Sequence, residues 1–323
     1  MRFFRGGQGP RPSPEEQARE QERAEKSQKM VEAGGIPLDA QERIERQLGR
    51  GGVWTSDLSV DELAALRGID YEPVAQVLGS SLYRVGWINT GLAIGPRYGG
   101  MGFPSAYGAM EPVENQGLTR ALIEARRRAI HRLELEAQAL KADGVVGVRL
   151  KISNWDWAQG LSEFTVLGTA VRRRGHAGGE ERPFTSTLTG QDMSKLVSSG
   201  YAPLRLVMGA SAQQAMMVFT YAGWYNREIG PFTRALHIAQ TAANHRIGLE
   251  AGEAGARGVV GVTFTSNIVE YSTGSEAVLG RIVQWVMLGT AVRPQPASQP
   301  VAAPRLVMPL RPRGETGGGS NVP

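Results

Sequence analysis

The 323-residue sequence contains no cysteine. This excludes disulfides, thiolate nucleophiles and cysteine-based zinc or iron–sulfur sites, because each of these needs a thiol. The sequence also lacks any run near the ~20 consecutive apolar residues that span a bilayer, and its first ten residues lack the apolar core of a secretory signal. We therefore expect a cytoplasmic protein without a membrane span.

Basic charge is not concentrated in any segment. Lys and Arg total 36 against 31 Asp and Glu, which gives a net charge of +5. The two densest basic clusters, 126–128 and 172–174, are only three residues long. A nucleic-acid-binding surface needs a more continuous basic stripe, so we expect no nucleic-acid partner.

The strongest positive feature is an internal repeat. Residues 118–148 align without gaps with residues 232–262, and 17 of the 31 positions are identical. Upstream, the segment that begins at Trp54 matches the segment that begins at Phe184 with a constant offset of 130 residues. Two copies of one domain therefore account for most of the chain.

The repeat predicts five consecutive parts of the chain. They are a charged, partly helical or disordered arm (1–52), a first domain (53–174), a linker (175–182), a second domain (183–294) and a disordered Pro/Gly-rich tail (295–323). Within the arm, residues 13–33 have the composition of a solvated helix. Asp39 and Glu42 have the spacing of a capping box that begins a second helix.

Each copy is predicted to begin with a short helix and a strand. Ser59 and Thr189 each precede an acidic residue by three positions, which is the spacing of a helix capping box. An apolar strand follows in each copy. We expect the two strands to end at Gly79 and Gly209, since glycine commonly interrupts a strand.

A long helix and two more strands complete each copy. The apolar residues of the helix recur with a 3.6-residue period, which predicts one narrow buried stripe. Gly144 and Gly258 are expected to end the two helices in the left-handed conformation. The predicted fold class is therefore α+β, with two tandem β-α-β-β units that each hold a three-stranded antiparallel sheet and one long helix. Such a unit buries little apolar surface alone and needs neighbours.

Histidines are the strongest metal ligands in the sequence, and there are four of them: His131, His176, His237 and His245. His237 and His245 are separated by about 12 Å along one helix, so they cannot share an ion. His131 and His245 occupy equivalent positions in the repeat, so symmetry can bring this pair together across an interface. They are the candidate ligands for a divalent metal; helix-surface histidines are the alternative interpretation.

Other chemical signals are weaker. Met208, Met216 and Met217 offer thioethers to copper, although packing is the commoner role of methionine. The Gly-rich segment 91–108 lacks the Gly-Lys-Ser/Thr ending of a phosphate-binding loop. No combination of nucleophile, base and orienting acid is evident, so we expect no enzymatic activity.

Two further features predict contacts of side chains, namely a pair of tryptophans in the first copy and a charged pair on each long helix. Trp155 and Trp157 lie between two predicted strands of the first copy, where we expect oligomer or partner contacts, with a ligand-stacking surface or simple packing as alternatives. Arg132 and Arg246 each precede a glutamate by four residues, which predicts an ion pair on each long helix.

Three motifs of both copies resemble the YbjQ-like proteins, a family labelled as heavy-metal-binding. The motifs are a helix that ends in Gly-Val-Val-Gly-Val, a closing Leu-Gly-Thr-Ala-Val-Arg and the glycine of the first strand. The resemblance implies a small strand-helix-strand-strand fold that assembles into pentameric rings. It implies no established enzymatic activity.

The sequence therefore predicts a non-enzymatic, oligomer-forming scaffold or binding protein. Its expected partners are other copies of itself and a protein or small ligand of unknown identity. Because five is odd, whole two-domain chains cannot tile one five-membered ring, whereas five chains can form two stacked rings. The alternative function is binding or buffering of zinc or copper through His131 and His245.

Overall fold

The computed structural model describes residues 13–49, 53–84, 111–154, 161–176, 182–218, 228–271 and 278–295. The N-terminal arm contains α1 (Pro14–Glu32) and α2 (Leu38–Leu48). The first unit, residues 53–176, contains α3 (Val60–Arg67), β1 (Tyr71–Arg84), β2 (Val113–Glu114), α4 (Gln116–Ala139), β3 (Gly144–Asn154) and β4 (Leu161–Arg173). The second unit, residues 182–295, contains β5 (Phe184–Thr185), α5 (Gly190–Ser198), β6 (Tyr201–Val218), α6 (Gly230–Glu253), β7 (Gly258–Tyr271) and β8 (Val278–Pro294).

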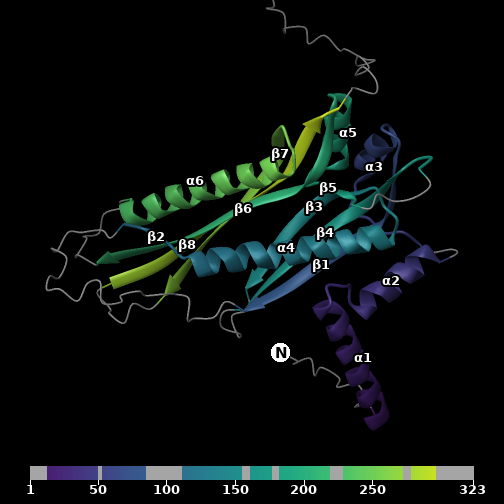
Figure 1. Cartoon of the computed structure of the whole chain (residues 1–323), viewed down its shortest axis with the longest axis horizontal. Helices are drawn as coiled ribbons and strands as arrows, with labels where there is room; N and C mark the ends of the chain where they lie inside the picture. The colour runs from purple at the N-terminus through teal and green to yellow at the C-terminus, as the bar shows by residue number, and fades with distance from the viewer. Residues whose placement is uncertain are drawn as a thin grey trace, which may run out of the picture.

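The described residues form six helices and two four-stranded sheets, which confirms the α+β class (Figure 1). The strand orders are β1-β4-β3-β5 and β2-β6-β8-β7. In both sheets the three long strands are antiparallel, as predicted. The fourth strand of each sheet was not predicted. It is two residues long and comes from the other unit, since β5 pairs with β3 and β2 pairs with β6.

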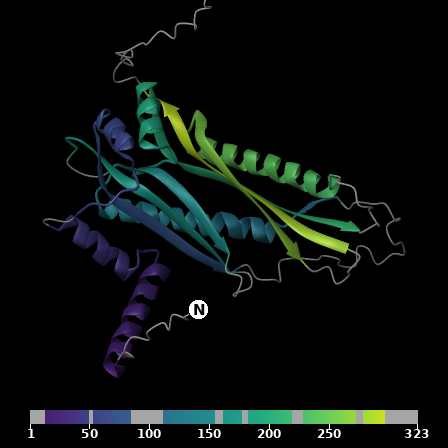
Figure 2. The same cartoon turned by 180° about the vertical axis from the view of Figure 1, so that it is seen from behind.

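Each long helix packs on the sheet of its own unit through the predicted apolar stripe. Helix α4 lies against β1 and β4, and α6 lies against β6 and β8 (Figures 1 and 2). The stripe is buried at Leu118, Leu122, Ala125, Ala129, Leu133, Ala137 and Leu140 in the first unit, and at Phe232, Ala239, Ala243, Ile247 and Ala251 in the second. The alanines in both stripes let the helix backbone come close to the sheet.

The expectation that Gly79 and Gly209 end the first strands is wrong, because both glycines lie inside long strands. A Cβ at Gly79 would overlap the carbonyl oxygen of Ala129, and a Cβ at Gly209 would overlap that of Ala243. Glycine is therefore required here because the helix backbone touches the strand, not because the strand stops.

The left-handed residues are also not the predicted glycines. Gly144 and Gly258 begin strands β3 and β7. Positive φ occurs instead three residues earlier, at Lys141 (53°) and at Gly255 (69°). Gly144 is needed for space, because a Cβ there would overlap the ring of Phe184.

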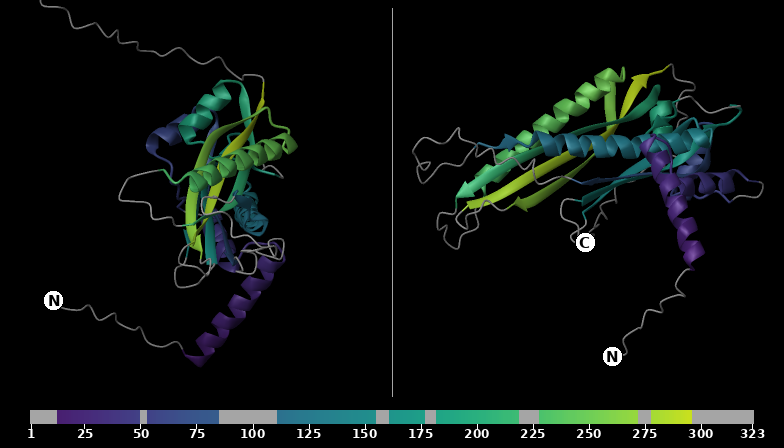
Figure 3. Two further views of the ribbon diagram at one scale, coloured as in Figure 1. Left: turned by 90° about the vertical axis from the view of Figure 1, so that its left-hand side faces the viewer. Right: turned by 60° about the horizontal axis from the view of Figure 1, so that its bottom comes forward.

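The N-terminal arm is helical in its described part. The α1 helix has no buried residue and projects away from the two sheets (Figure 3). Asp39 is not the N-cap of α2, since Pro37 precedes the helix and Asp39 lies in its first turn. Asp39 and Glu42 instead accept hydrogen bonds from Arg23 of α1 at 2.7 and 2.6 Å. The two predicted capping residues thus join the two helices of the arm.

Both predicted caps of the short helices are present. The Ser59 hydroxyl accepts the amide of Glu62, and the Thr189 hydroxyl accepts the amide of Asp192, both at 3.2 Å. None of the helices in the described ranges is long and apolar enough to cross a membrane.

Candidate functional site

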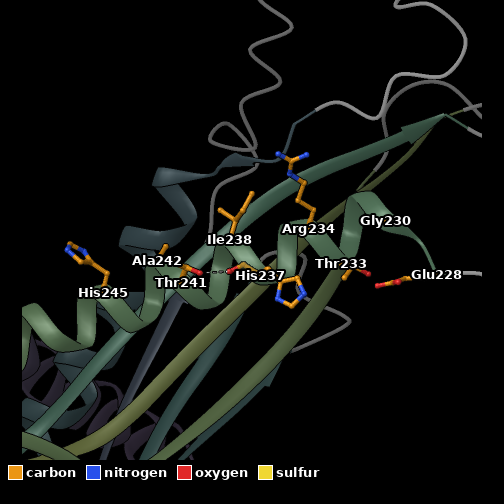
Figure 4. Close-up of a pocket in the computed structure, with 9 residues that line it drawn as sticks. All are labelled: Glu228, Gly230, Thr233, Arg234, His237, Ile238, Thr241, Ala242 and His245. Carbon is orange, nitrogen blue, oxygen red and sulfur yellow. Dashed lines mark hydrogen bonds between the residues drawn. The ribbon is translucent and has the colours of Figure 1, made fainter.

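The structure places the two candidate metal ligands on separate surfaces. His131 is exposed on α4 and lines a depression of about 370 Å³ beside β6, together with Glu134 and Arg205. His245 is exposed on α6 and lines a wide, open depression of about 730 Å³ (Figure 4). The two histidines line different depressions, so these surfaces do not combine them in one site.

The depression on α6 also contains His237, but it does not have the shape of a metal site. The His237 and His245 rings point in different directions, and Ile238 and Ala242 lie between them (Figure 4). The described residues contain no group of three His, Asp or Glu side chains that could hold a metal ion. The donor set present in the described part of one chain does not fit a metal site, and metal binding through His131 and His245 stays a prediction.

The remaining candidates are core residues or lie outside the described residues. Met208 is buried in the core and Met216 packs against it, as is common for methionine. The side chain of Met217, both tryptophans of 155–157 and the Gly-rich segment 91–108 lie outside the described residues.

The two predicted ion pairs within α4 and α6 are absent. Glu136 accepts the amide of Leu78, and Glu250 accepts the amide of Met208, each at 2.8 Å. Both glutamates therefore hydrogen-bond the strand beneath the helix, where a buried amide needs an acceptor. Burial raises the pKa of Glu136 above its usual value, whereas the hydrogen bond from Leu78 and the charge of Arg43 oppose that rise.

The arginines of these predicted pairs also contact the strand below them. Arg132 donates to the carbonyl oxygen of Ser80, and Arg246 donates to that of Ala210 at 2.7 Å. Arg246 has a second partner in the other unit. Its Nη1 and Nη2 lie 2.6 and 2.8 Å from the two carboxylate oxygens of Glu114, and this contact lowers the pKa of Glu114.

The start of α4 continues this contact along the edge of β6. The amide of Asn115 donates to the carbonyl oxygen of Ala212 at 2.8 Å. The amide of Ala212 donates to the hydroxyl of Thr119 at 3.0 Å, and the hydroxyl of Ser211 donates to Glu114 at 3.0 Å. The first unit thus satisfies both backbone groups of Ala212 on the edge of β6.

The second unit returns a different contact, on the edge of β3. The amide of Ser186 donates to the carbonyl oxygen of Val145, and the amide of Val148 donates to the carbonyl oxygen of Ser186, both at 2.9 Å. We call these two sets of contacts, 113–119 with the second unit and 184–188 with β3, the inter-unit interface. It is head-to-tail, because the two units contribute different surfaces.

One buried charge was missed by sequence reasoning. Arg126 is fully buried, and its guanidinium has no hydrogen-bond partner in the described part of the chain. It lies 5.4 Å from the centre of the Phe164 ring, and burial lowers its pKa to about 9. The signal was its place four residues after Leu122, on the apolar side of the helix.

Comparison with known proteins identifies a full-length relative. The chain is 36% identical over 266 residues to the encapsulin nanocompartment protein Rv1762c of Mycobacterium tuberculosis, and the alignment covers 80% of this chain and 92% of the mycobacterial protein. The chain belongs to the family of that protein. No solved structure matches this member of the Rv1762c family.

Shorter matches cover smaller parts of the chain. A family model described as "Putative heavy-metal-binding" (YbjQ) matches residues 101–174. A UPF0145 protein of Psychrobacter arcticus is 50% identical over 54 residues, which is 17% of this chain and 33% of that protein. A UPF0145 protein of Vibrio campbellii is 29% identical over 102 residues, which is 32% of this chain and 96% of that protein. Nearly a whole UPF0145 protein thus matches about a third of this chain.

Proposed function

We propose that the chain is a non-enzymatic, self-associating component of an encapsulin nanocompartment and acts in the cytoplasm. The observation that carries this proposal is the match over 92% of a mycobacterial encapsulin nanocompartment protein. The names of the relatives state no enzymatic activity.

The inter-unit interface gives a physical reason for self-association. A unit of three long strands and one helix buries little apolar surface alone. Each unit here covers a strand edge of the other unit, which is how a sheet edge is protected from uncontrolled pairing. Further units of the same fold can join in the same way, so the scaffold grows from a contact that already exists within the chain.

A ring is the expected closed form, as the resemblance to pentameric YbjQ-like proteins implies. The two units of one chain lie edge to edge, which favours a single ring of alternating first and second units over two stacked rings. Because every chain adds two units, such a ring holds an even number of units. Five chains, for example, supply ten.

The alternative function, binding of zinc or copper, is favoured only by the label of the matching family model. Within the described part of one chain, His131 and His245 line different depressions. The metal proposal therefore depends on contacts between chains.

Native mass spectrometry at micromolar concentration tests self-association. The expected species have masses that are integer multiples of 34.8 kDa, and a strictly monomeric chain overturns the proposal. Co-expression with the encapsulin shell protein of the source organism tests the second part. The chain is expected to elute with shell-sized particles, and an oligomer that is absent from these particles overturns the nanocompartment role.

A further inference from the structure

The repeat carries a second set of the residues that form the inter-unit interface. Over the long helices the two copies are offset by 114 residues, so Glu228 and Arg132 correspond to Glu114 and Arg246. Arg132 already donates to the carbonyl oxygen of Ser80, just as Arg246 donates to the carbonyl oxygen of the equivalent residue, Ala210. Yet Glu228 is exposed, and neither it nor Arg132 has an ion pair among the described residues. Glu228 and Arg132 could therefore form the same salt bridge, but they do not form it with each other within one chain.

The strand edge next to this unformed salt bridge is also uncovered in the described part of the chain. Leu82 of β1 corresponds to Ala212 of β6, whose amide and carbonyl both bond the start of α4. Leu82 is 62% exposed, and its edge of β1 has no neighbouring strand in the described sheet. The groups that would cover it are the amide of Ile229 and the hydroxyl of Thr233, at the start of α6. Both lie on the opposite unit of the chain.

The edge of β7, which is the counterpart of the paired edge of β3, is also uncovered among the described residues. Val148 of β3 is 3% exposed because the second unit pairs with this edge, whereas its counterpart Val262 of β7 is 42% exposed. The segment that matches the covering strand β5 begins at Trp54, which is 45% exposed. Among the residues that the structure describes, edge β7 and segment 54–58 therefore lack the strand pairing that their counterparts have.

Segment 54–58 already has the local contacts of its paired counterpart. The Ser56 hydroxyl lies 3.0 Å from the hydroxyl of Thr169 and accepts the amide of Leu58. The Ser186 hydroxyl lies 3.2 Å from that of Thr290 and accepts the amide two residues on in the same way. The segment needs little rearrangement to pair, which lowers the entropic cost of binding.

The open depression on α6 completes the pattern (Figure 4). Its residues Thr233 and His245 correspond to Thr119 and His131 of α4. On α4, Thr119 and His131 each line a depression whose other wall is formed by the second unit. The α6 depression is thus the surface that a first unit would cover.

We propose that a second copy of this chain occupies these surfaces, with the second unit of one chain docked on the first unit of the next. Glu228 then pairs with Arg132 of the next chain, α6 covers the edge of β1, and residues 54–58 of that chain pair with β7. Charge complementarity and continuity with the inter-unit interface both select this occupant. The inference rests on the proposed self-association and adds its interface.

This contact is head-to-tail, so each chain retains one free surface of each kind until the assembly closes. Such contacts form closed rings when the rotation per chain divides a full turn. The proposed interface therefore needs no further contact type to make the expected ring.

Cysteine cross-linking tests the pairing, because the natural chain has no cysteine. Val145 and Thr185 are paired residues within one chain, and their counterparts are Val259 and Thr55. Paired residues in neighbouring strands lie about 5 Å apart at Cα, which suits a disulfide. We would co-express Thr55→Cys chains with mass-tagged Val259→Cys chains. A Val145→Cys/Thr185→Cys chain, which is expected to form an intrachain bridge, is the positive control.

After mild oxidation, the mixed dimer is expected to exceed each homodimer at least tenfold. A statistical mixture, in which the mixed dimer is only twice as abundant as each homodimer, overturns the inference. Glu228→Arg is expected to weaken association at least tenfold. The matched control is Glu253→Arg, an exposed glutamate at the other end of α6 and outside the depression that Glu228 lines, and it should associate like the natural chain.

These outcomes separate the two proposals. A natural chain that is monomeric overturns both. A natural chain that is oligomeric, but shows neither the mixed disulfide nor sensitivity to Glu228→Arg, overturns the interface and leaves self-association standing.

Discussion

Glu114 and Arg246 join the two units through a two-point ion pair, with nitrogen-to-oxygen distances of 2.6 and 2.8 Å. The residues are 132 positions apart in sequence, and their side chains are 24% and 31% exposed. A bidentate arginine–carboxylate contact fixes orientation as well as distance. This pair therefore sets how α4 of the first unit lies against β6 of the second.

Replacing Glu114 by Gln is expected to destabilise the chain at neutral pH by about 1–3 kcal/mol, because Arg246 loses a charged, hydrogen-bonded partner. The pKa of Glu114 is lowered in the folded state, chiefly by Arg246. Its stabilising contribution is therefore present above the ordinary glutamate pKa and is lost as the pH falls through the folded pKa. Urea unfolding at pH 7 and below pH 4 measures the difference.

The control for this substitution is Glu111→Gln. Glu111 pairs with Arg234, but both side chains are mostly exposed. Exposed pairs contribute little, so this variant should unfold like the natural chain at both pH values. An effect as large as that of Glu114→Gln would contradict the special role of the Glu114 contact.

The close approach of α6 to β6 predicts a large effect at Gly209. Gly209→Ala is expected to cost about 3 kcal/mol or more, since the new methyl group would overlap the carbonyl oxygen of Ala243. Gly248 lies on α6, the helix that holds Ala243. The new methyl group of Gly248→Ala meets no atom within 4 Å, so this variant should stabilise the chain by about 0.5–1 kcal/mol through helix propensity. Thermal and urea unfolding measure both. Equal effects at the two positions would contradict the close contact.

The sequence predicted what depends on local periodicity. The stripe from Leu118 to Leu140 follows from the 3.6-residue repeat, and the caps at Ser59 and Thr189 follow from a three-residue spacing. Gly79 was misassigned because a glycine at a strand end and a glycine under a helix look alike in sequence. The difference depends on a tertiary contact.

The inter-unit interface was beyond sequence reasoning for the same physical cause. Arg246 was assigned to the glutamate four residues later, since a helix surface offers that partner locally. Its actual partner, Glu114, lies in the other unit, and Glu250 instead satisfies a strand amide. Strands as short as β2 and β5 also have no periodic signal, because two residues cannot show alternation.

The histidines give a test of the metal alternative. His131→Ala/His245→Ala is expected to bind zinc and copper with an affinity within twofold of the natural chain, because the two imidazoles lie in different depressions. Isothermal titration with each metal measures this, and His237→Ala serves as a control from the same helix surface. A loss of tenfold or more that is confined to the double variant would instead assign a metal site to these residues.

Arg126 predicts an unusual gain in stability. Arg126→Met is expected to stabilise the chain by about 1–3 kcal/mol at pH 7.5, because a buried guanidinium without a hydrogen bond in the described structure costs more than its contact with the Phe164 ring returns. Urea unfolding of the gel-filtered protein measures the change in the free energy of unfolding. Arg127→Met, at the exposed neighbouring position, is the matched control and should change stability by less than about 0.5 kcal/mol.

The pH dependence of this gain distinguishes a buried charge from altered packing. Burial lowers the pKa of Arg126 to about 9, whereas the unfolded chain keeps the ordinary, much higher arginine value. Above pH 9 the unfolded state therefore binds a proton that the folded state has released, so this group alone makes the natural chain more stable by about 1.4 kcal/mol per pH unit. The advantage of Arg126→Met should consequently shrink between pH 7.5 and 10.5. An advantage that stays constant over this range would show that packing, and not the buried charge, separates the two chains.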